Sequence, residues 1–437
     1  MAGEHEVFRD TQSPVIPTQP TNHPLSFNPS RRSTYTMSSP PANHPNIAII
    51  GAGPSGLVTL VTLLNRGVPA TLYEREASSS ARAHLGGMLD LTWDEGQRAL
   101  RENGLAEVFK TTSRLDAQEA RICGKDGVPR LRRTENDVTD ETQTRPEIDR
   151  RVLRDIMLAA VPESAVKWGH ALASVRALDE GSGKHELTFI NGLVVVADIL
   201  IGADGAHSRI RPLVSPATPI YHDITGAEIS IAPAVAALPE NADIVDNIGL
   251  GSCYCLEGGQ TFFSQRNGDG RIRTYALHRG PLDWALPREP QEARRVLLEM
   301  YKDWAPWMRK MIEVCDEDAI YPRPMFYLPV GHRWTHTPGV TIIGDAAHLM
   351  GPFAGAGANL AMLDGLELGL VLADAVTKGL GVEEREAAIA AVEEKMCARA
   401  EVFAAVTQRN AKAAFGPGAP QAMIDAFIEG HSAAVVV

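Results

Sequence analysis

Three features that mark other classes of protein are scarce in this sequence. The net charge is −12 and Lys/Arg clusters with interleaved aromatic residues are lacking, which argues against nucleic acid as a partner. The five cysteines are odd in number and irregular in spacing, so they favour a reducing, cytoplasmic compartment over a disulfide framework. The longest apolar helical stretch, residues 355–376, contains three acidic residues and therefore predicts a soluble helix and no membrane span.

A metal site is not expected either. Cys253 and Cys255 would lie on one face of a strand, but the sequence supplies no second pair and no histidine cluster to complete a tetrahedral site. We therefore interpret the five cysteines as small core residues. The expected partner is a small molecule, and we expect the chain to act as a monomer.

The N-terminal segment is predicted to lie outside the folded part. Residues 1–44 are rich in Pro, Ser, Thr and Asn and show no apolar periodicity, which is typical of a disordered extension. Early acidic residues argue against a mitochondrial presequence, and the lack of an apolar core region argues against a secretory signal.

A dinucleotide-binding unit is predicted directly after this extension. An apolar strand at residues 46–50 precedes the glycines Gly51, Gly53 and Gly56, and a helix follows at residues 57–64. The next strand, residues 70–73, ends at Glu74, about where an acidic residue meets a ribose hydroxyl in such units. The complete strand–helix–strand pattern predicts dinucleotide binding, without distinguishing FAD from NAD.

A second glycine-rich turn is predicted near the C-terminus. The buried strand 340–343 runs into Gly344 and Asp345, which places a carboxylate where a ligand's hydroxyl groups could reach it. Gly355 and Gly357 then open a helix, and the positive end of that helix favours a negatively charged group.

A third turn lies between these two. The strand 199–202 leads into Asp204 and Gly205, with Ser208 and Arg211 three and six residues after the glycine. Taken alone, this segment could equally be a polar turn that caps a helix.

The three motifs, in this order, resemble those of the class A, single-component FAD-dependent monooxygenases. Two further stretches, residues 74–91 and 146–154, are similar to the tetracycline-inactivating members of that family, and the resemblance spans roughly residues 46–410. It implies an α/β (α+β insert) fold: a Rossmann-like FAD-binding domain of the para-hydroxybenzoate hydroxylase type, an inserted mixed-sheet substrate domain and a long C-terminal helix.

The resemblance also implies the cofactor-binding residues. For FAD these are Gly51, Gly53, Gly56, Glu74, Arg75, Asp90, Arg150, Asp204, Gly344, Asp345, Gly355, Gly357, Ala358 and Asn359. Arg82 would lie near the entry route of the nicotinamide, and Gly205, Ser208 and Arg211 would serve both cofactors.

The implied chemistry is that of a flavin hydroxylase. NADPH (or NADH) would reduce FAD, O2 would give a flavin C4a-hydroperoxide, and an aromatic or polyketide-like substrate would be hydroxylated. Two alternatives stay open: Baeyer–Villiger or epoxidising chemistry on a secondary metabolite, and a non-redox binding protein with the flavoprotein fold. No side chain is identified as catalytic. Strand alternation offers Gln265, Arg273 and Tyr275 as substrate contacts.

Departures from the family pattern affect the expected substrate. Ala356 stands where the family usually has Gln, and Gly351 stands where the tetracycline enzymes have a proline. Residues 225–279 match those enzymes poorly. We therefore expect a natural substrate other than tetracycline.

The expected domain organisation is interleaved. The FAD-binding domain covers residues 45–211 and 329–380, the substrate domain covers 212–328, and a bridging helix and tail cover 381–437. Predicted helices are 94–110, 150–158, 291–312 with an interruption at Pro306, and a final helix at 383–413. Strands within 166–176 and 186–201 are expected to join the FAD sheet, and strands at 261–265 and 271–277 to form a hairpin around residues 267–270.

Overall fold

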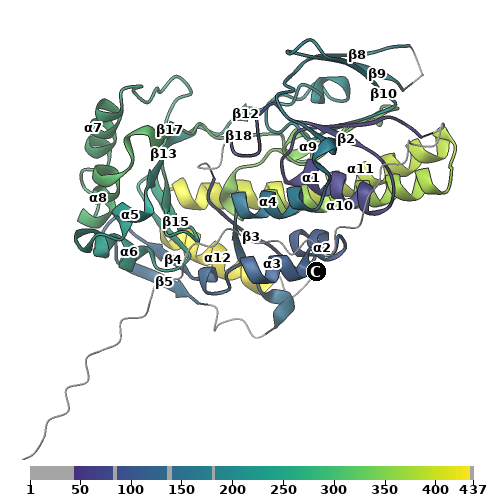
Figure 1. Ribbon diagram of the computed structural model, residues 1–437. Helices are drawn as coiled ribbons and strands as arrows, with labels where there is room; N and C mark the ends of the chain where they lie inside the picture. Colours follow the sequence, from purple (N-terminus) through teal and green to yellow (C-terminus); the bar gives the residue numbers. More distant parts are fainter. Residues whose placement is uncertain (1–43, 82–85, 135–139, 180–182, 434–437) are drawn as a thin grey trace, which may run out of the picture. The chain divides into compact units, whose positions relative to one another are not determined.

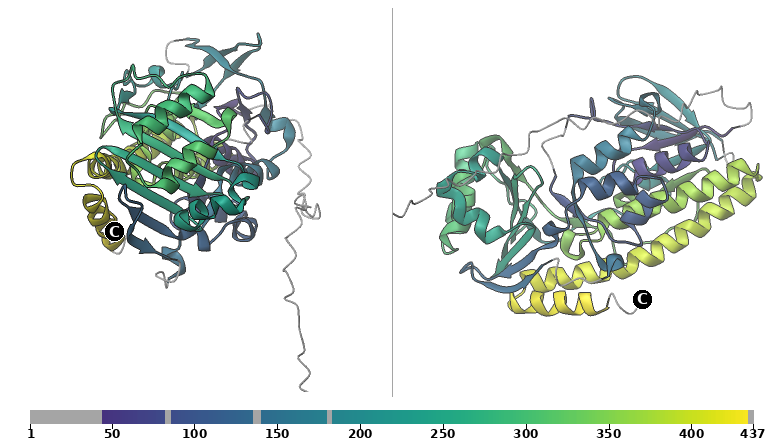
Figure 2. Two further views of the ribbon diagram at one scale, coloured as in Figure 1. Left: turned by 90° about the vertical axis from the view of Figure 1, so that its left-hand side faces the viewer. Right: turned by 60° about the horizontal axis from the view of Figure 1, so that its bottom comes forward.

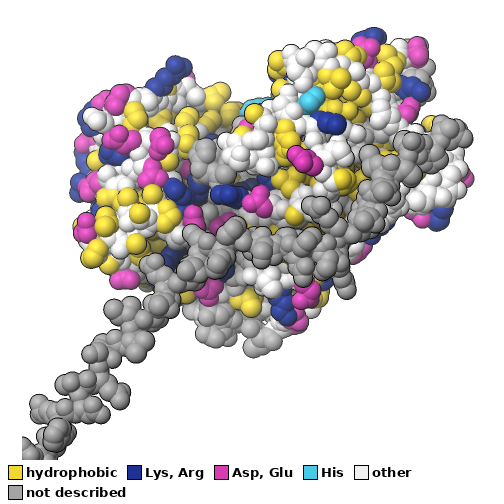
Figure 3. Space-filling view, viewed as in Figure 1, with side chains coloured by type: hydrophobic (Ala, Val, Ile, Leu, Met, Phe, Trp, Pro, Cys, Tyr) yellow, Lys and Arg dark blue, Asp and Glu magenta, His cyan; other side chains and the backbone are white. Residues whose placement is uncertain are grey.

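The computed structural model describes residues 44–81, 86–134, 140–179 and 183–433. The residues in the predicted N-terminal extension before residue 44, and Arg82, lie outside these ranges. The chain forms a mixed α/β fold with two principal sheets, which lie toward opposite sides of Figure 1. The helices that the structure describes are too short or too polar to pass through a bilayer. On the face that Figure 3 shows, basic and acidic side chains are interspersed.

The first sheet has five parallel strands in the order β19-β11-β1-β2-β7. Its strands are β1 (Ile47–Ile50), β2 (Thr71–Tyr73), β7 (Val166–Lys167), β11 (Ile199–Gly202) and β19 (Val340–Ile342). Helices α1 (Pro54–Asn65) and α10 (Gly357–Thr377) pack closely against each other beside it. Every residue of β1 and β11 is buried, as the apolar runs predicted. All three predicted glycine-rich turns follow strands of this one sheet.

The three strands within residues 172–197 do not join that sheet, which corrects the prediction. β8 (Leu172–Ala177), β9 (His185–Phe189) and β10 (Val194–Ala197) form a separate antiparallel sheet of three strands. β7 and β11 alone, from the predicted stretches 166–176 and 186–201, enter the parallel sheet. In β9 buried residues alternate with partly buried ones, as expected of an antiparallel sheet that packs one face inward.

The second large sheet has seven strands in the order β17-β13-β16-β15-β14-β4-β5. Its strands are β4 (Ala120–Cys123), β5 (Pro129–Arg133), β13 (Ile224–Ile231), β14 (Ser252–Glu257), β15 (Gln260–Arg266), β16 (Ile272–Arg279) and β17 (Ile320–Pro322). The β15–β16 hairpin confirms the predicted strand pair. β4 and β5 come from within residues 45–211, which the sequence assigned to the FAD-binding domain, so the two segments share this sheet.

Helices α5 (Pro233–Ala236), α6 (Ala242–Ile248), α7 (Pro290–Met300) and α8 (Pro306–Val314) cover one face of the seven-stranded sheet (Figure 2, left). The interruption predicted at Pro306 within residues 291–312 is confirmed, because α7 ends at Met300 and Pro306 begins α8. Cys123, Cys253 and Cys255 lie on this covered face, with all three sulfur atoms within 4.8 Å of one another. The sequence spacing did not reveal the third thiol.

The predicted helix 94–110 is also two helices, α2 (Gly96–Arg101) and α3 (Ala106–Thr112). Gly104, with φ of +74°, turns the chain between them, since a left-handed residue cannot continue a helix. The predicted helix near residue 150 is confirmed as α4 (Arg150–Ala159).

Two short ribbons and one long helix connect the parallel sheet with the seven-stranded sheet. The ribbons are β3 (Met88–Asp90) with β6 (Glu147–Asp149), and β12 (Ile220–Tyr221) with β18 (Phe326–Tyr327). The long helix α11 (Val382–Phe415) runs beside α10 and reaches the seven-stranded sheet (Figure 2, right). The sequence predicted that this helix is the last one. The structure corrects this, because α12 (Gln421–Ala433) follows α11 and packs on it.

Candidate active site

The turn after β1 is closed on one side and open on the other. A Cβ atom on Gly51, whose φ is +109°, would lie 2.2 Å from the carbonyl oxygen of Ala203. A Cβ on Gly56 would lie 2.0 Å from the carbonyl oxygen of Gly51. Nothing lies within 4 Å of the position that a Cβ on Gly53 would take, and α1 begins there without a capping side chain. This arrangement suits a pyrophosphate held at a helix N-terminus.

Glu74 lies at the tip of β2 beside this turn, as predicted. Its side chain is buried, and its two oxygens accept hydrogen bonds from the backbone N–H groups of Ala52 (2.7 Å) and Glu76 (3.0 Å). These bonds fix the carboxylate, because rotation would leave buried amide groups without partners. The neighbouring Arg75 is 66% exposed and faces solvent.

The Asp204 turn combines a capping function with one unused acceptor. Ser208 Oγ accepts hydrogen bonds from the N–H groups of Ile210 and Arg211, so it caps the turn, as the alternative interpretation of this segment required. Asp204 Oδ2 accepts from the Arg209 N–H at 2.7 Å. Asp204 Oδ1 is buried and has no hydrogen-bond partner within the described residues. A buried acceptor of this kind is expected to meet a ligand or water.

Arg211 holds two loops together. It is 2% exposed, and its guanidinium donates to the carbonyl oxygens of Ala206 (2.7 Å), Ala346 (2.7 Å) and Asp345 (3.3 Å). Its Nε and one of its two Nη groups are therefore engaged with backbone carbonyl groups, and its contact with a cofactor stays a prediction.

Asp345 opens the short helix α9 (Asp345–His348) after Gly344, whose φ of +60° turns the chain out of β19. Its side chain is exposed and makes no hydrogen bond or ion pair within the described residues. The carboxylate is thus available to accept hydrogen bonds from a ligand's hydroxyl groups. Arg150 approaches from α4: its backbone N–H donates to the carbonyl of Gly87, and its side chain packs where Gly86 lacks a Cβ.

The loop between α9 and α10 is tied to the β3–β6 ribbon. Gly355 has a left-handed φ of +64°, and a Cβ on it would lie 3.6 Å from Asp90 Oδ1. The Asn359 side chain donates to the carbonyl of Asp90 at 2.8 Å and accepts from the N–H of Thr92 at 2.9 Å. α10 begins at Gly357 without a capping side chain, and a Cβ on Gly357 would meet nothing within 4 Å. Ala358 follows in the first turn of that helix.

A buried network of charged side chains connects α9, α10 and α11 beside the loop between α9 and α10. His348 Nε2 lies 2.5 Å from Asp364 Oδ2, and Arg399 of α11 donates to Asp364 Oδ1 and Glu367 Oε2, each at 3.0 Å. Burial lowers the pKa of His348, but the charge and hydrogen bond of Asp364 outweigh it and raise the pKa above its ordinary value. Asp364 also accepts from the N–H of Gly344, which links α10 to the Asp345 turn.

The three predicted substrate contacts all lie on the face of the seven-stranded sheet that is not covered by α5–α8. Gln265 and Arg273 are directly opposite each other. Gln265 accepts from the N–H of Met88, and the buried Arg273 donates to Glu228 Oε1 at 3.0 Å. Tyr275 has a hydroxyl without a hydrogen-bond partner in the described part of the chain. All three stay predicted substrate contacts, and Tyr275 is the one whose polar atom makes no hydrogen bond within the described residues.

Sequence reasoning missed several residues beside these. Phe353, in the loop between α9 and α10, packs against His222 and Phe263, with ring centroids 5.7 and 6.2 Å apart, and Phe263 also meets Tyr254 at 5.5 Å. His222 Nε2 is buried and has no partner within the described residues, and burial lowers the pKa of His222 so that the ring is neutral at pH 7. No local motif marks these residues, because they meet through tertiary packing.

Glu147 was also missed. It pairs across the ribbon with Asp90, and its Oε2 is buried without a partner in the described residues. Burial and the nearby charge of Asp90 raise the pKa of Glu147 well above its usual range.

Comparison with known proteins places this geometry among flavoproteins. The model of the FAD binding domain family matches residues 45–387. A monooxygenase of Penicillium thymicola, penA, is 30% identical over 371 residues, which is 74% of this chain and 83% of that protein. The structure of Klebsiella pneumoniae HpxO complexed with FAD and uric acid is similar with a TM-score of 0.71 at 20% identity, over 89% of this chain and 93% of the other.

The tetracycline destructase Tet(55) is similar in structure, with a TM-score of 0.69 at 18% identity, over 90% of this chain and 97% of that one. At this identity the likeness concerns the fold alone. The special similarity to the tetracycline enzymes that the sequence suggested is thus seen in the fold, whereas a fungal monooxygenase matches the sequence at 30% identity.

Proposed function

The chain belongs to the FAD binding domain family and is an FAD-dependent monooxygenase, and from this premise we propose that it uses NAD(P)H and O2 to hydroxylate an electron-rich aromatic or polyketide-like molecule. The observation that carries the proposal is the set of unused acceptors and open glycines at three turns of one sheet. Asp345 is exposed without a partner, Asp204 Oδ1 is buried without one within the described residues, and Gly53 and Gly357 leave open space.

These residues fit FAD in our proposal. Gly53 and α1 would hold the pyrophosphate, Glu74 the ribose, Asp345 the ribityl chain, and the N-terminus of α10 at Gly357 the flavin ring. Bound FAD supplies the electron transfer and the activation of O2. The protein's own residues hold the cofactor in place, position the substrate and exclude water.

The substrate would lie between the loop containing Phe353 and the uncovered face of the seven-stranded sheet. Phe263 and Tyr254 offer aromatic packing, and the Tyr275 hydroxyl can donate a hydrogen bond. His222, which is neutral, can accept a hydrogen bond at Nε2 from a substrate hydroxyl, which makes a phenol more electron-rich. The uric acid in the HpxO complex is likewise a small planar molecule.

The test is the origin of the oxygen in the product. The purified protein is incubated with NADPH, isotopically labelled O2 and a panel of phenols and polyketide-like phenols, and the products are analysed by mass spectrometry. One labelled oxygen atom in a hydroxyl group supports the proposal. Oxygen from water, or a dehydrogenated product without added oxygen, contradicts it. Labelled oxygen in a ring ester would indicate a Baeyer–Villiger reaction instead of hydroxylation, and labelled oxygen in an epoxide would indicate epoxidation.

Asp345→Ala tests the role of the Asp345 carboxylate in binding FAD. Asp374→Asn, which removes an exposed carboxylate from α10, is the control. We expect Asp345→Ala to lose most of its bound FAD and turnover, and the control to keep both. With tetracycline as substrate, we expect NADPH consumption to yield mainly hydrogen peroxide.

A further inference from the structure

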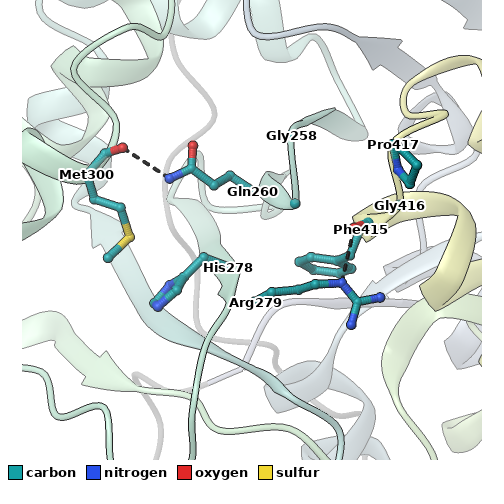
Figure 4. Close-up of a pocket in the computed structure, with 9 residues that line it drawn as sticks. Gly258, Gln260, His278, Arg279, Met300, Phe415, Gly416 and Pro417 are labelled. Atoms are coloured by element: carbon teal, nitrogen blue, oxygen red, sulfur yellow. Dashed lines mark hydrogen bonds between the residues drawn. The ribbon is translucent and has the colours of Figure 1, made fainter.

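A cavity of about 520 Å³ lies at the end of the seven-stranded sheet, apart from the turns that would hold FAD. It is formed by the β14–β15 turn, the last residues of β16, the end of α7 and the end of α11. Figure 4 shows Met300 and His278 on one side and Phe415 to Pro417 on the other, with Arg279 extending between them. The volume lies within the range of small-molecule pockets.

The cavity is lined by apolar groups and one available cation. Met300, Phe415 and Pro417 supply the apolar lining, and the glycines of the β14–β15 turn leave the wall open. Gln260 is engaged, since it donates to the carbonyl of Met300 and accepts from the indole N–H of Trp304. Arg279 is exposed, and its Nε donates to the carbonyl of Phe415 at 3.1 Å.

Arg279 has no carboxylate partner in the part of the chain that the structure describes. Neighbouring arginines do: Arg273 of β16 and Arg323, which follows β17, pair with Glu228, and Arg271, which precedes β16, pairs with Asp316. A guanidinium beside an apolar wall can pair with an anionic group in a fixed, two-donor geometry. With Nε held by the Phe415 carbonyl, the two Nη groups of Arg279 have no hydrogen-bond or ion-pair partner within the described residues.

We propose that this cavity is a second small-molecule site, which binds an aromatic acid with its ring against Met300, Phe415 and Pro417 and its anionic group on Arg279. The site is distinct from the flavin site but adjoins it. The Phe415 ring packs on Phe353 with centroids 5.7 Å apart. This pair of rings therefore separates the cavity, on the Phe415 side, from the proposed substrate site, on the Phe353 side.

A structural role for Arg279 predicts a different result. Its bond to the Phe415 carbonyl also caps the C-terminus of α11, where a cation is favourable. If capping is its whole contribution, its loss should alter stability without altering the preference for a charged ligand. The experiment therefore compares two probes that differ in charge alone, 2-naphthoate and 2-naphthamide, by isothermal titration calorimetry on the FAD-loaded protein.

The wild type should bind 2-naphthoate about tenfold more tightly than 2-naphthamide, because a charge-assisted hydrogen bond is worth about one such factor. Arg279→Gln should bring this ratio to about one and leave the amide's affinity unchanged. Arg288→Gln, at an exposed arginine outside the cavity, should keep the wild-type ratio. Met300→Trp, which fills the apolar part, should weaken both probes and preserve the ratio.

Three results would overturn the proposal: an unchanged ratio in Arg279→Gln, binding that is indifferent to Met300→Trp, or no measurable binding of either probe to the wild type. The FAD content and melting temperature of each variant are measured in parallel. Loss of FAD from the wild type would instead count against the proposed oxygenase function, so the two failures are distinguishable.

Discussion

His336 should make the stability of this protein depend on pH. Its Nδ1 lies 2.9 Å from Glu393 Oε2 and its Nε2 lies 3.2 Å from Glu386 Oε2, so one imidazole joins two carboxylates of α11. The hydrogen bonds to Glu386 and Glu393 raise the pKa of His336 from 6.5 to about 9. Glu386 also accepts from the N–H of Gly339, directly before β19, which carries Asp345 at its end. Arg385 is the other charged group at this cluster.

The size of the effect follows from the pKa. A tenfold change in proton affinity is worth about 1.4 kcal/mol, so a rise from 6.5 to about 9 corresponds to roughly 3 kcal/mol. His336 is 17% exposed, and solvent screening reduces this to about 2 kcal/mol. Because the folded-state pKa is the higher one, the stabilisation is complete below pH 6.5 and is lost as the pH rises through 9.

The assay is denaturant unfolding of the wild type and of His336→Gln between pH 6 and pH 10, with the free energies of unfolding subtracted at each pH. We expect the wild type to be more stable by about 2 kcal/mol at pH 6–7, and the difference to shrink toward zero above pH 9. Glu383→Gln, which removes an exposed carboxylate from the first turn of α11, should show a small difference that does not follow this curve. A difference for His336→Gln that stays constant across the range would refute the reasoning.

Three further outcomes follow from the site. Asp345→Asn should keep the shape of its side chain but weaken FAD binding, measured as flavin released on dilution, because the amide replaces one acceptor oxygen. Gly56→Ala should be both less stable and poor in FAD, since its Cβ would lie 2.0 Å from the Gly51 carbonyl oxygen; normal flavin absorbance in that variant would contradict the close packing described for this turn. Arg399→Gln should lower the free energy of unfolding by about 3 kcal/mol, because it leaves Asp364 with less compensation in a buried site, and an unchanged unfolding curve would show that the network contributes little.

The parts of the fold that were predictable from sequence are those that local chemistry determines. The glycines at 51, 53 and 56 lie within one strand–turn–helix unit, so their geometry follows from neighbouring residues, and the structure confirms that unit. The break at Gly104 was missed because the apolar residues on both sides of it keep a helical spacing, and that spacing does not reveal the left-handed conformation of the glycine. The separate sheet of β8–β10 was missed because strand pairing depends on residues far apart in the chain.

The same distinction applies to the site. Acidic residues after buried strands, such as Asp204 and Asp345, could be identified from the pattern, since the carboxyl ends of parallel strands meet at one edge of a sheet. His222 and Glu147 could not, because their chemistry comes from burial and from partners on other elements. Nε2 of His222 and Oε2 of Glu147 are buried atoms without a hydrogen-bond partner in the described residues, and only the folded structure shows this.

The position of α11 explains how the distant parts of this site are held in register. Its carboxylates at 386 and 393 bind His336 before β19, Arg399 binds the Asp364 that faces His348, and Asn410 donates to the carbonyl of Phe353 at 2.9 Å. At about 100° per residue, positions 386 and 393 lie on one face of α11 and positions 399 and 410 lie on another, so the rotation of α11 about its axis sets both groups of contacts. Displacing α11 by one residue along the chain would break its contacts to the Asp345 turn, to the loop between α9 and α10, and to the Arg279 cavity at the same time. The loop that carries Phe353 is therefore positioned by a helix whose sequence contains none of the cofactor motifs.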